Sequence, residues 1–210
     1  MYNINMKILL LCAALLGLCA AQQDPSLPVF KIDLNLDPKL RFKEPLMYFL
    51  PQVKDLISKY EPLFPQVVVS LFHRLDWIIK WYHSERYAEI EGMAELGGID
   101  PHVALMINYV YEFTSFCTSL IARQEDGLIM HLRMLDFDFP DETRNITYVA
   151  QFYKGDQYQY EAVMFCGLAA MQTGFKKGAF SISINQREPS DGTSWVDFLK
   201  NAGMIFLSYQ

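Results

Sequence analysis

Cys117 is the residue of this sequence whose type and surroundings are best suited to covalent chemistry. A thiol becomes a strong nucleophile as the thiolate, and a nearby guanidinium favours that form. Arg133 and Asp136 follow closely in the sequence. One hypothesis is a catalytic Cys117 assisted by Arg133 and Asp136. A disulfide between Cys117 and Cys166 in a purely structural protein is the alternative.

The residues around Cys117 predict a β-hairpin. Segments 117–123 and 128–137 are typical of strands, and Asp126-Gly127 between them is a preferred two-residue turn. Counting outward from that turn pairs Cys117 with Asp136. The sequence therefore predicts that Cys117 and Asp136 meet where the hairpin opens.

Arg133 lies three residues before Asp136, so the two side chains are predicted on opposite faces of a regular strand. Both can reach Cys117 only if a bulge or a strand end intervenes. Histidine is a common base beside a catalytic cysteine, but His131 is predicted opposite Ala122, away from Cys117. The other histidines fall on predicted helices, where surface or capping roles are expected: His73, His83 and His102. No spacing is typical of a zinc site, and we expect no metal or cofactor.

The region upstream of Cys117 is predicted to be mainly helical. After a short extended segment, 29–36, apolar residues recur at helical spacing over 47–60 and 65–93. Two prolines, Pro45 and Pro51, are predicted to bracket a first short element. An Asp-Pro pair then starts a helix at 101–113 that leads directly into Cys117.

The predicted helix 65–93 contains an unusual aromatic stretch, LFHRLDWIIKWYHSERY. Its spacing places one set of apolar residues on one side: Leu71, Leu75, Ile78, Ile79 and Tyr82. Trp77 and Trp81 add to that apolar character. A buried helix is one interpretation, and an aromatic surface that touches lipid is the other.

Downstream of Cys117 the pattern favours strands and then a last helix. Further strands are predicted at 146–154, 158–166 and 179–185, with turns at Gly155-Asp156 and Lys177-Gly178, and a helix at 194–209. A helical part followed by strands predicts the α+β class.

The start of the chain is typical of a secretory signal peptide. Lys7 precedes an apolar run at 8–18, and small residues follow before Gln22. Removal of residues 1–21 leaves 17 of the 18 basic residues against 24 acidic ones, a net charge of −7. This balance argues against nucleic acid as a partner. Asn145 begins a glycosylation sequon, which fits a secreted or lysosomal protein.

The motif around Cys117 also resembles a known family. The run YEFTSFCTSLIARQEDGLIMHLRMLDFDF, residues 111–139, is similar to the acid ceramidase and N-acylethanolamine acid amidase family, whose members read Cys-Thr-Ser and then His-x-Arg-x-x-Asp at this separation. The resemblance continues through EIEGMAELGGIDPHVALMINYVYE upstream and GLAAMQTGFKKGAFSISINQRE downstream.

The resemblance implies an N-terminal nucleophile (Ntn) hydrolase with a four-layer αββα sandwich, here incomplete at its C-terminus. It implies self-cleavage between Phe116 and Cys117, which divides the precursor into an α chain, 22–116, and a β chain, 117–210. The new α-amino group of Cys117, with a pKa near 8, would act as the base. Arg133 and Asp136 match the family residues that position this amine and the substrate carbonyl.

The implied substrate is a lipid amide, either a ceramide or an N-acylethanolamine, hydrolysed in the lysosome or outside the cell. The helix around Trp77 and Trp81 would dock on a membrane or micelle.

Two departures from the family favour an alternative. Asn185 is followed by Gln186, where the family usually has glutamate. The family's β chain is also longer and supplies further site residues. The alternative is a catalytically inactive or truncated relative that binds lipid or regulates another protein.

Overall fold

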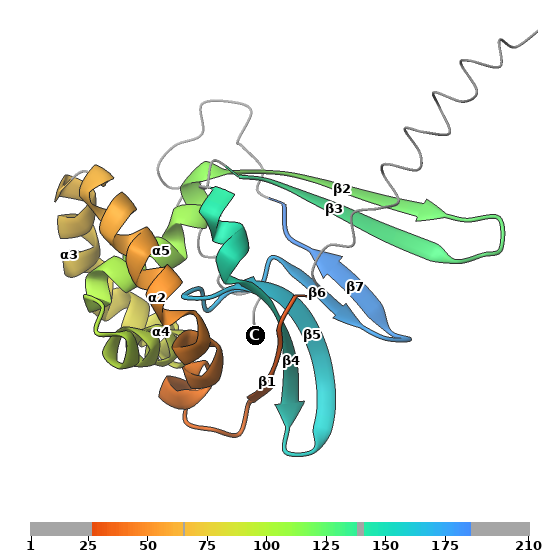
Figure 1. Cartoon of the computed structure of the whole chain (residues 1–210), viewed down its shortest axis with the longest axis horizontal. Coiled ribbons are helices and arrows are strands. Elements are labelled where there is room, and N and C mark those ends of the chain that lie inside the picture. Colours follow the sequence, from red (N-terminus) through yellow and green to blue (C-terminus); the bar gives the residue numbers. More distant parts are fainter. Residues whose placement is uncertain (1–26, 65, 138–140, 186–210) are drawn as a thin grey trace, which may run out of the picture.

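The computed structural model describes residues 27–64, 66–137 and 141–185 (Figure 1). Helices dominate upstream of Cys117 and strands dominate downstream, so the predicted α+β class is confirmed. The helices are α2 (Lys43–Tyr60), α3 (Gln66–Tyr82), α4 (Ser84–Gly97) and α5 (Pro101–Thr114), with 3₁₀ turns η1 (Pro38–Leu40), η2 (Glu61–Leu63) and η3 (Asp141–Ile146). The predicted signal peptide at 1–21 and the predicted helix at 194–209 lie outside the described residues.

The strands form two sheets. They are β1 (Val29–Asp33), β2 (Ser115–Arg123), β3 (Ile129–Phe137), β4 (Thr147–Lys154), β5 (Gln157–Phe165), β6 (Thr173–Lys176) and β7 (Phe180–Ser183). Five of them make one sheet in the order β1-β4-β5-β6-β7, and β2 and β3 make an antiparallel hairpin. Strand β1 is parallel to β4, whereas the other neighbours are antiparallel. Because β1 comes from the upstream half of the chain, the two halves share this sheet.

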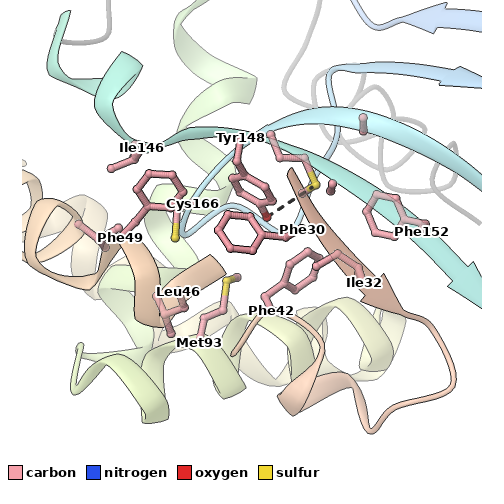
Figure 2. Packing of buried hydrophobic residues seen from close by; sticks show 14 of the residues in the cluster. Phe30, Ile32, Phe42, Leu46, Phe49, Met93, Ile146, Tyr148, Phe152 and Cys166 are labelled. Carbon is pink, nitrogen blue, oxygen red and sulfur yellow. Dashed lines mark hydrogen bonds between the residues drawn. The ribbon is translucent and has the colours of Figure 1, made fainter. Parts of the chain in front are cut away.

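One face of the five-stranded sheet packs on the helices. Strand β4 buries every second residue, including Tyr148 and Phe152, against the apolar face of α2, which includes Leu46 and Phe49. Figure 2 shows the side chains of this core, with Phe30 of β1 in edge contact with Tyr148. Burying apolar area of this kind contributes roughly 25 cal/mol per Å². This core joins the upstream and downstream halves of the chain.

The hairpin contacts the opposite face of the sheet at β7. Residues directly across neighbouring strands share a face, and the register links Ala162, which is buried toward the helices, to Gly174 and then to Ile182. Ser181 and Ser183 alternate with Ile182 and therefore lie on the other face. Both serines hydrogen-bond to side chains of β2 and β3. In the described residues the helices cover one face of the sheet, and the hairpin lies beside the edge strand β7 (Figure 1).

Two helix predictions need correction. Segment 65–93 is two helices, because the backbone at His83 leaves the helical region with φ −134° and ψ 52°. Pro51 does not end an element but lies inside α2. Proline removes one backbone hydrogen bond there, and the buried residues on both sides of Pro51 keep the helix continuous. Pro45 lies in the first turn, where the missing N–H costs little.

The predicted helix start at Asp100 and the predicted turns at Gly155 and Gly178 are confirmed. Asp100 caps α5, accepting hydrogen bonds from the backbone N–H of His102 at 2.8 Å and of Val103 at 3.2 Å. Burial alone would raise the Asp100 pKa, but these two N–H donors lower it overall. Gly98 ends α4 with φ 61°, and Gly155 and Gly178 adopt positive φ in the predicted turns.

The short strand β6 was not predicted. Among the helices described, none combines the length and the apolar character needed to cross a bilayer.

Candidate active site

The hairpin turn has three residues rather than two. Gln124 donates its backbone N–H to the carbonyl of Leu128 at 2.8 Å and accepts from Gly127 N–H at 3.0 Å. Gly127 has φ 88°, as a three-residue loop with a left-handed glycine requires. The extra loop residue shifts the register by one. The predicted pairing of Cys117 with Asp136 is therefore wrong.

In the observed register Cys117 lies opposite Leu135, and Asp136 lies opposite Phe116. Ser119 lies opposite Arg133. Residues two apart on a strand share a face and lie about 7 Å apart, so Cys117, Ser119 and Arg133 occupy one face of the hairpin. The shift therefore brings Arg133 to the Cys117 face without the bulge that the sequence argument required.

Arg133 joins the hairpin to the end of β7. Its Nη1 donates to Asn185 Oδ1 at 3.0 Å, and its Nη2 donates to the carbonyl of Ile184 at 2.6 Å. Nη1 also lies 3.3 Å from the carbonyl oxygen of Met134. The guanidinium is thus held in a fixed position on the hairpin face that carries Cys117.

A second set of contacts surrounds His131. It lies opposite Ile121, not opposite Ala122 as predicted. Its Nδ1 is 2.9 Å from Ser181 Oγ, and its Nε2 is 3.1 Å from Ser183 Oγ. His131 is therefore further from Cys117 along the hairpin, as expected, but it binds β7 through both ring nitrogens.

Ser119 connects the two sets of contacts. Its Oγ is 2.7 Å from Ser183 Oγ and 3.1 Å from Asn185 Oδ1. Three serines at this contact were not predicted as site residues: Ser119, Ser181 and Ser183. The only local signal was the polar side of the alternating Ser-Ile-Ser-Ile segment of β7, which indicates that this face has hydrogen-bonding rather than apolar neighbours.

The two described cysteines have different environments and are not joined in a disulfide. Cys166 is buried in the core, where its thiol donates to the carbonyl of Pro45 at 3.6 Å. Burial raises the pKa of Cys166 to about 12. Cys117 is partly exposed. The disulfide alternative is thus overturned for this structure, and Cys117 is the better placed nucleophile of the two.

Of the predicted site residues, Arg133 and Asn185 are hydrogen-bonded to each other, and Cys117 lies on the same face of the hairpin as Arg133. Phe116 and Asp136 are described by their backbone register alone. They pair with each other, next to the pair of Cys117 and Leu135. Gln186 lies outside the described residues.

A separate polar cluster links α3 to the start of α5. His73, Asp100 and His102 bring possible ligand atoms within 4.8 Å of one another, and His102 Nε2 is 3.6 Å from Asp76. The two imidazole rings stack, however, with centroids 3.5 Å apart and planes 27° apart. Ring-nitrogen lone pairs lie in the ring plane, so stacked rings do not converge on one ion. The cluster is therefore a packing contact between helices.

Comparison with known proteins finds relatives with two names, acid ceramidase and N-acylethanolamine-hydrolyzing acid amidase, although no family model matches the chain. The chain is 27% identical to acid ceramidase of Bos taurus over 184 residues, which cover 79% of this chain and 47% of that protein. It is 28% identical to acid ceramidase of Mus musculus, with the same coverage. It is 27% identical to the N-acylethanolamine-hydrolyzing acid amidase of Rattus norvegicus over 164 residues, which cover 77% of this chain and 45% of that protein. The chain thus spans about half the length of these relatives.

Proposed function

We propose that the chain, which is similar to acid ceramidase and N-acylethanolamine-hydrolyzing acid amidase, is a lipid amidase of that family and is activated by self-cleavage. The cleaved bond is the one between Phe116 and Cys117. The observation that carries the proposal is the placement of Cys117 and Arg133 on one face of the hairpin, with Arg133 held by β7. The substrate is the amide bond of a ceramide or an N-acylethanolamine.

Self-cleavage needs only groups that adjoin the bond. Cys117 Sγ adds to the carbonyl carbon of Phe116, the C–N bond breaks, and the released nitrogen takes a proton. Water then hydrolyses the thioester, which leaves a carboxylate on Phe116 and an α-amino group on Cys117. Arg133 supports the first step because it places a positive charge on the hairpin face that carries Cys117.

The same cysteine then acts on the lipid. Its α-amino group takes the thiol proton, since such amines have a pKa near 8. Sγ attacks the amide carbonyl of the substrate, the amine departs with a proton, and water releases the fatty acid from the thioester. In this proposal Asp136 positions the new amine, as its place in the family motif implies, and no metal or cofactor takes part.

The layers of the fold support an Ntn-hydrolase arrangement. Helices cover one face of the five-stranded sheet, and the Cys117 face of the hairpin hydrogen-bonds to Ser183 of β7 and to Asn185. The turn end of the Cys117 face exposes Ile121 and Ile129, and the other face of the hairpin exposes apolar side chains that include Leu120, Leu132 and Met134. A second helical layer would cover this apolar face in the complete αββα sandwich.

The shared sheet explains how two cleaved chains, 22–116 and 117–210, would remain one protein. Strand β1 pairs with β4 over five residues, and the core in Figure 2 contains side chains from both chains. We therefore propose that the α and β chains stay associated without a disulfide.

The surface of α3 supports contact with a lipid phase. Trp77 is 68% exposed and Trp81 is 75% exposed, and Ile78 and Tyr82 are exposed beside them. Ile78 and Tyr82, which were expected on one apolar side with Ile79, are exposed, whereas Phe72 is buried and Ile79 is partly buried; the interpretation of α3 as a buried helix therefore holds for only part of its surface. Aromatic side chains at a helix surface favour the interface of a membrane or micelle.

The compartment is also part of the proposal. A signal peptide at 1–21 would direct the chain to the secretory pathway, and Asn145 lies exposed in η3, where a glycan could be attached. We propose the lysosome or the extracellular space as its location.

The test is maturation of the full chain at acidic pH, followed on a denaturing gel. Wild type is expected to give two chains, with cysteine as the N-terminal residue of the second, whereas Cys117→Ala should remain whole. Matured protein is then incubated with a ceramide or an N-acylethanolamine, and the released fatty acid is measured. A wild-type chain that stays whole under conditions where it is folded would rule out self-cleavage.

One observation favours a second function. Gln186 replaces a family glutamate next to Asn185, and loss of that carboxylate would suit a relative that binds lipid without hydrolysing it. Gln186→Glu distinguishes the two, because a gain of cleavage or turnover in this variant would identify the wild type as the non-catalytic form. Equal activity of both proteins would dismiss it.

A further inference from the structure

The side chains between the hairpin and β7 form a continuous chain of hydrogen bonds. It runs from His131 through Ser183 and Ser119 to Asn185, which also binds Arg133. We infer that His131 is a positioning residue: its Nε2–H starts this chain, which fixes Asn185 beside Arg133 on the Cys117 face. The inference rests on the proposed function for its catalytic consequence, but not for its structural content.

The direction of the chain is set at Arg133. A guanidinium has only donors, so the atom of Asn185 that receives Nη1 at 3.0 Å must be the amide oxygen. Ser119 Oγ lies 3.1 Å from this same oxygen. Because Oδ1 can only accept, the Ser119 hydroxyl must donate to it.

Each hydroxyl has a single proton, so the direction of one hydrogen bond fixes the direction of the next. The Ser119 proton is used on Asn185, so Ser119 accepts from Ser183 across their 2.7 Å contact. The Ser183 proton is then used as well, so Ser183 must accept from His131 Nε2 at 3.1 Å. His131 is therefore protonated at Nε2.

The other nitrogen of His131 is not constrained in this way. Ser181 Oγ, 2.9 Å from Nδ1, can donate to a neutral ring or accept from an imidazolium. Both protonation states thus keep the chain intact, and only the neutral tautomer that carries its proton on Nδ1 alone breaks it.

The chain of hydrogen bonds limits which atoms Asn185 can offer to a substrate. With its oxygen held by Ser119 and Arg133, Asn185 can offer only its NH₂ group to a reacting carbonyl. An amide donor in a fixed position stabilises developing negative charge. His131 would thus influence catalysis from a distance, by holding the orientation of Asn185 and Arg133.

Replacement of His131 tests the inference directly. In His131→Gln the side-chain NH₂ takes the place of Nε2, whereas in His131→Asn the NH₂ lies near the place of Nδ1. We expect self-cleavage of His131→Gln within about threefold of wild type, and His131→Asn and His131→Phe slower by at least about tenfold, with unchanged melting temperatures. Equal rates for the Gln and Asn variants would overturn the inference.

The two serines of β7 provide a matched pair. Ser183→Ala interrupts the chain to Asn185, whereas Ser181→Ala removes only the partner of Nδ1 on the same strand and face. Cleavage should slow in Ser183→Ala and remain near the wild-type rate in Ser181→Ala. The same loss in both variants would mean that the serines only hold the sheets together, and the inference would fail.

One measurement does not depend on catalysis. Long-range ¹H–¹⁵N spectra of Cys117→Ala report which nitrogen of His131 carries the proton, and we expect a protonated Nε2. A neutral ring protonated at Nδ1 alone would refute the inference even if the enzyme is active. If wild type does not cleave but Nε2 is protonated, the proposed function fails while the hydrogen-bond chain stands.

Discussion

Arg133 Nη1 donates to Asn185 Oδ1 at 3.0 Å, and this bond joins strand β3 to the second residue after β7. A second donor of the same guanidinium reaches the carbonyl of Ile184 at 2.6 Å. The planar fork of arginine suits two acceptors at once, which a lysine ammonium cannot match. The arrangement therefore depends on the shape of the side chain as well as on its charge.

Arg133→Lys tests this dependence. The variant keeps the positive charge but loses the paired geometry, so we expect self-cleavage to slow on the order of tenfold. Arg123→Lys, at the exposed far end of the same hairpin, is the control and should cleave at the wild-type rate. The measurement is the rate of chain separation on a denaturing gel. A rate of Arg133→Lys equal to wild type would show that charge alone suffices.

The two described cysteines are expected to differ in reactivity. Burial raises the pKa of Cys166 to about 12, so at pH 8 its reactive thiolate is about a thousandfold rarer than for an ordinary thiol. Cys117 is partly exposed. Iodoacetamide should therefore modify Cys117 in the folded protein and Cys166 only after unfolding. Peptide mass spectrometry with and without urea measures this, and rapid labelling of folded Cys166 would contradict the described core.

Trp77 and Trp81 form an exposed aromatic stripe on α3, and this stripe should govern binding to lipid surfaces. Trp81→Ser and Trp77→Ser remove exposed rings and should weaken binding to phosphatidylcholine vesicles by several-fold each. Tyr48→Ser, on α2 and 61% exposed, is a control outside the stripe. Vesicle co-sedimentation measures the bound fraction. Equal binding by all three variants would show that α3 does not face the lipid.

Local patterns predicted most of the elements of the fold. Helical spacing and the Asp100 cap located α5, and the glycines at 155 and 178 located two turns, because these signals act within a few residues. The pairing of β1 with β4 and the short strand β6 were not predicted. Both depend on contacts between distant parts of the chain, which leave no periodicity in the sequence.

The site shows a similar division. Cys117 and Arg133 could be selected from their chemistry and from the motif, but their relative placement depended on one loop residue before Leu128. A three-residue loop ending in Gly127 and a two-residue loop place opposite sets of side chains on the inner face. Ser119 and Ser183 could not be selected, because their role arises only where the two sheets meet.

Glu89 should make the stability of the protein depend on pH. Burial raises its pKa, even though the hydrogen bond from Arg41 at 2.9 Å acts in the opposite direction. Between the unfolded pKa, near 4.5, and the higher folded pKa, the folded state holds the proton more tightly. The free energy of unfolding should therefore fall as the pH rises through that window.

Glu89→Gln should flatten this part of the pH profile, because glutamine does not titrate. Urea unfolding at several pH values between 4.5 and 7 measures it. Glu44→Gln, at an exposed position in the first turn of α2, is the control and should keep the wild-type slope. A wild-type slope in Glu89→Gln would mean that another group causes the dependence.

Asn108 anchors the helix that leads into Cys117. Its buried amide donates to the carbonyls of Ala104 and Gly167, each at 2.9 Å, and its oxygen accepts from Ala169 N–H at 2.8 Å. These bonds tie α5 to the loop after β5, so the start of β2 depends on them.

Replacing Asn108 should therefore destabilise the protein more than a surface change does. Asn108→Ala leaves two groups of the loop without their partner, and each buried unsatisfied group costs about 1–3 kcal/mol. We expect a loss of about 3 kcal/mol in the free energy of unfolding, measured with urea, whereas Gln52→Ala on the exposed side of α2 should change it by less than about 0.5 kcal/mol. Asn108→Asp keeps the acceptor for Ala169 but sets a carboxylate against two carbonyls, so it should be destabilising as well. If both variants unfold like wild type, the loop does not rely on Asn108, and α5 must be held by its apolar contacts alone.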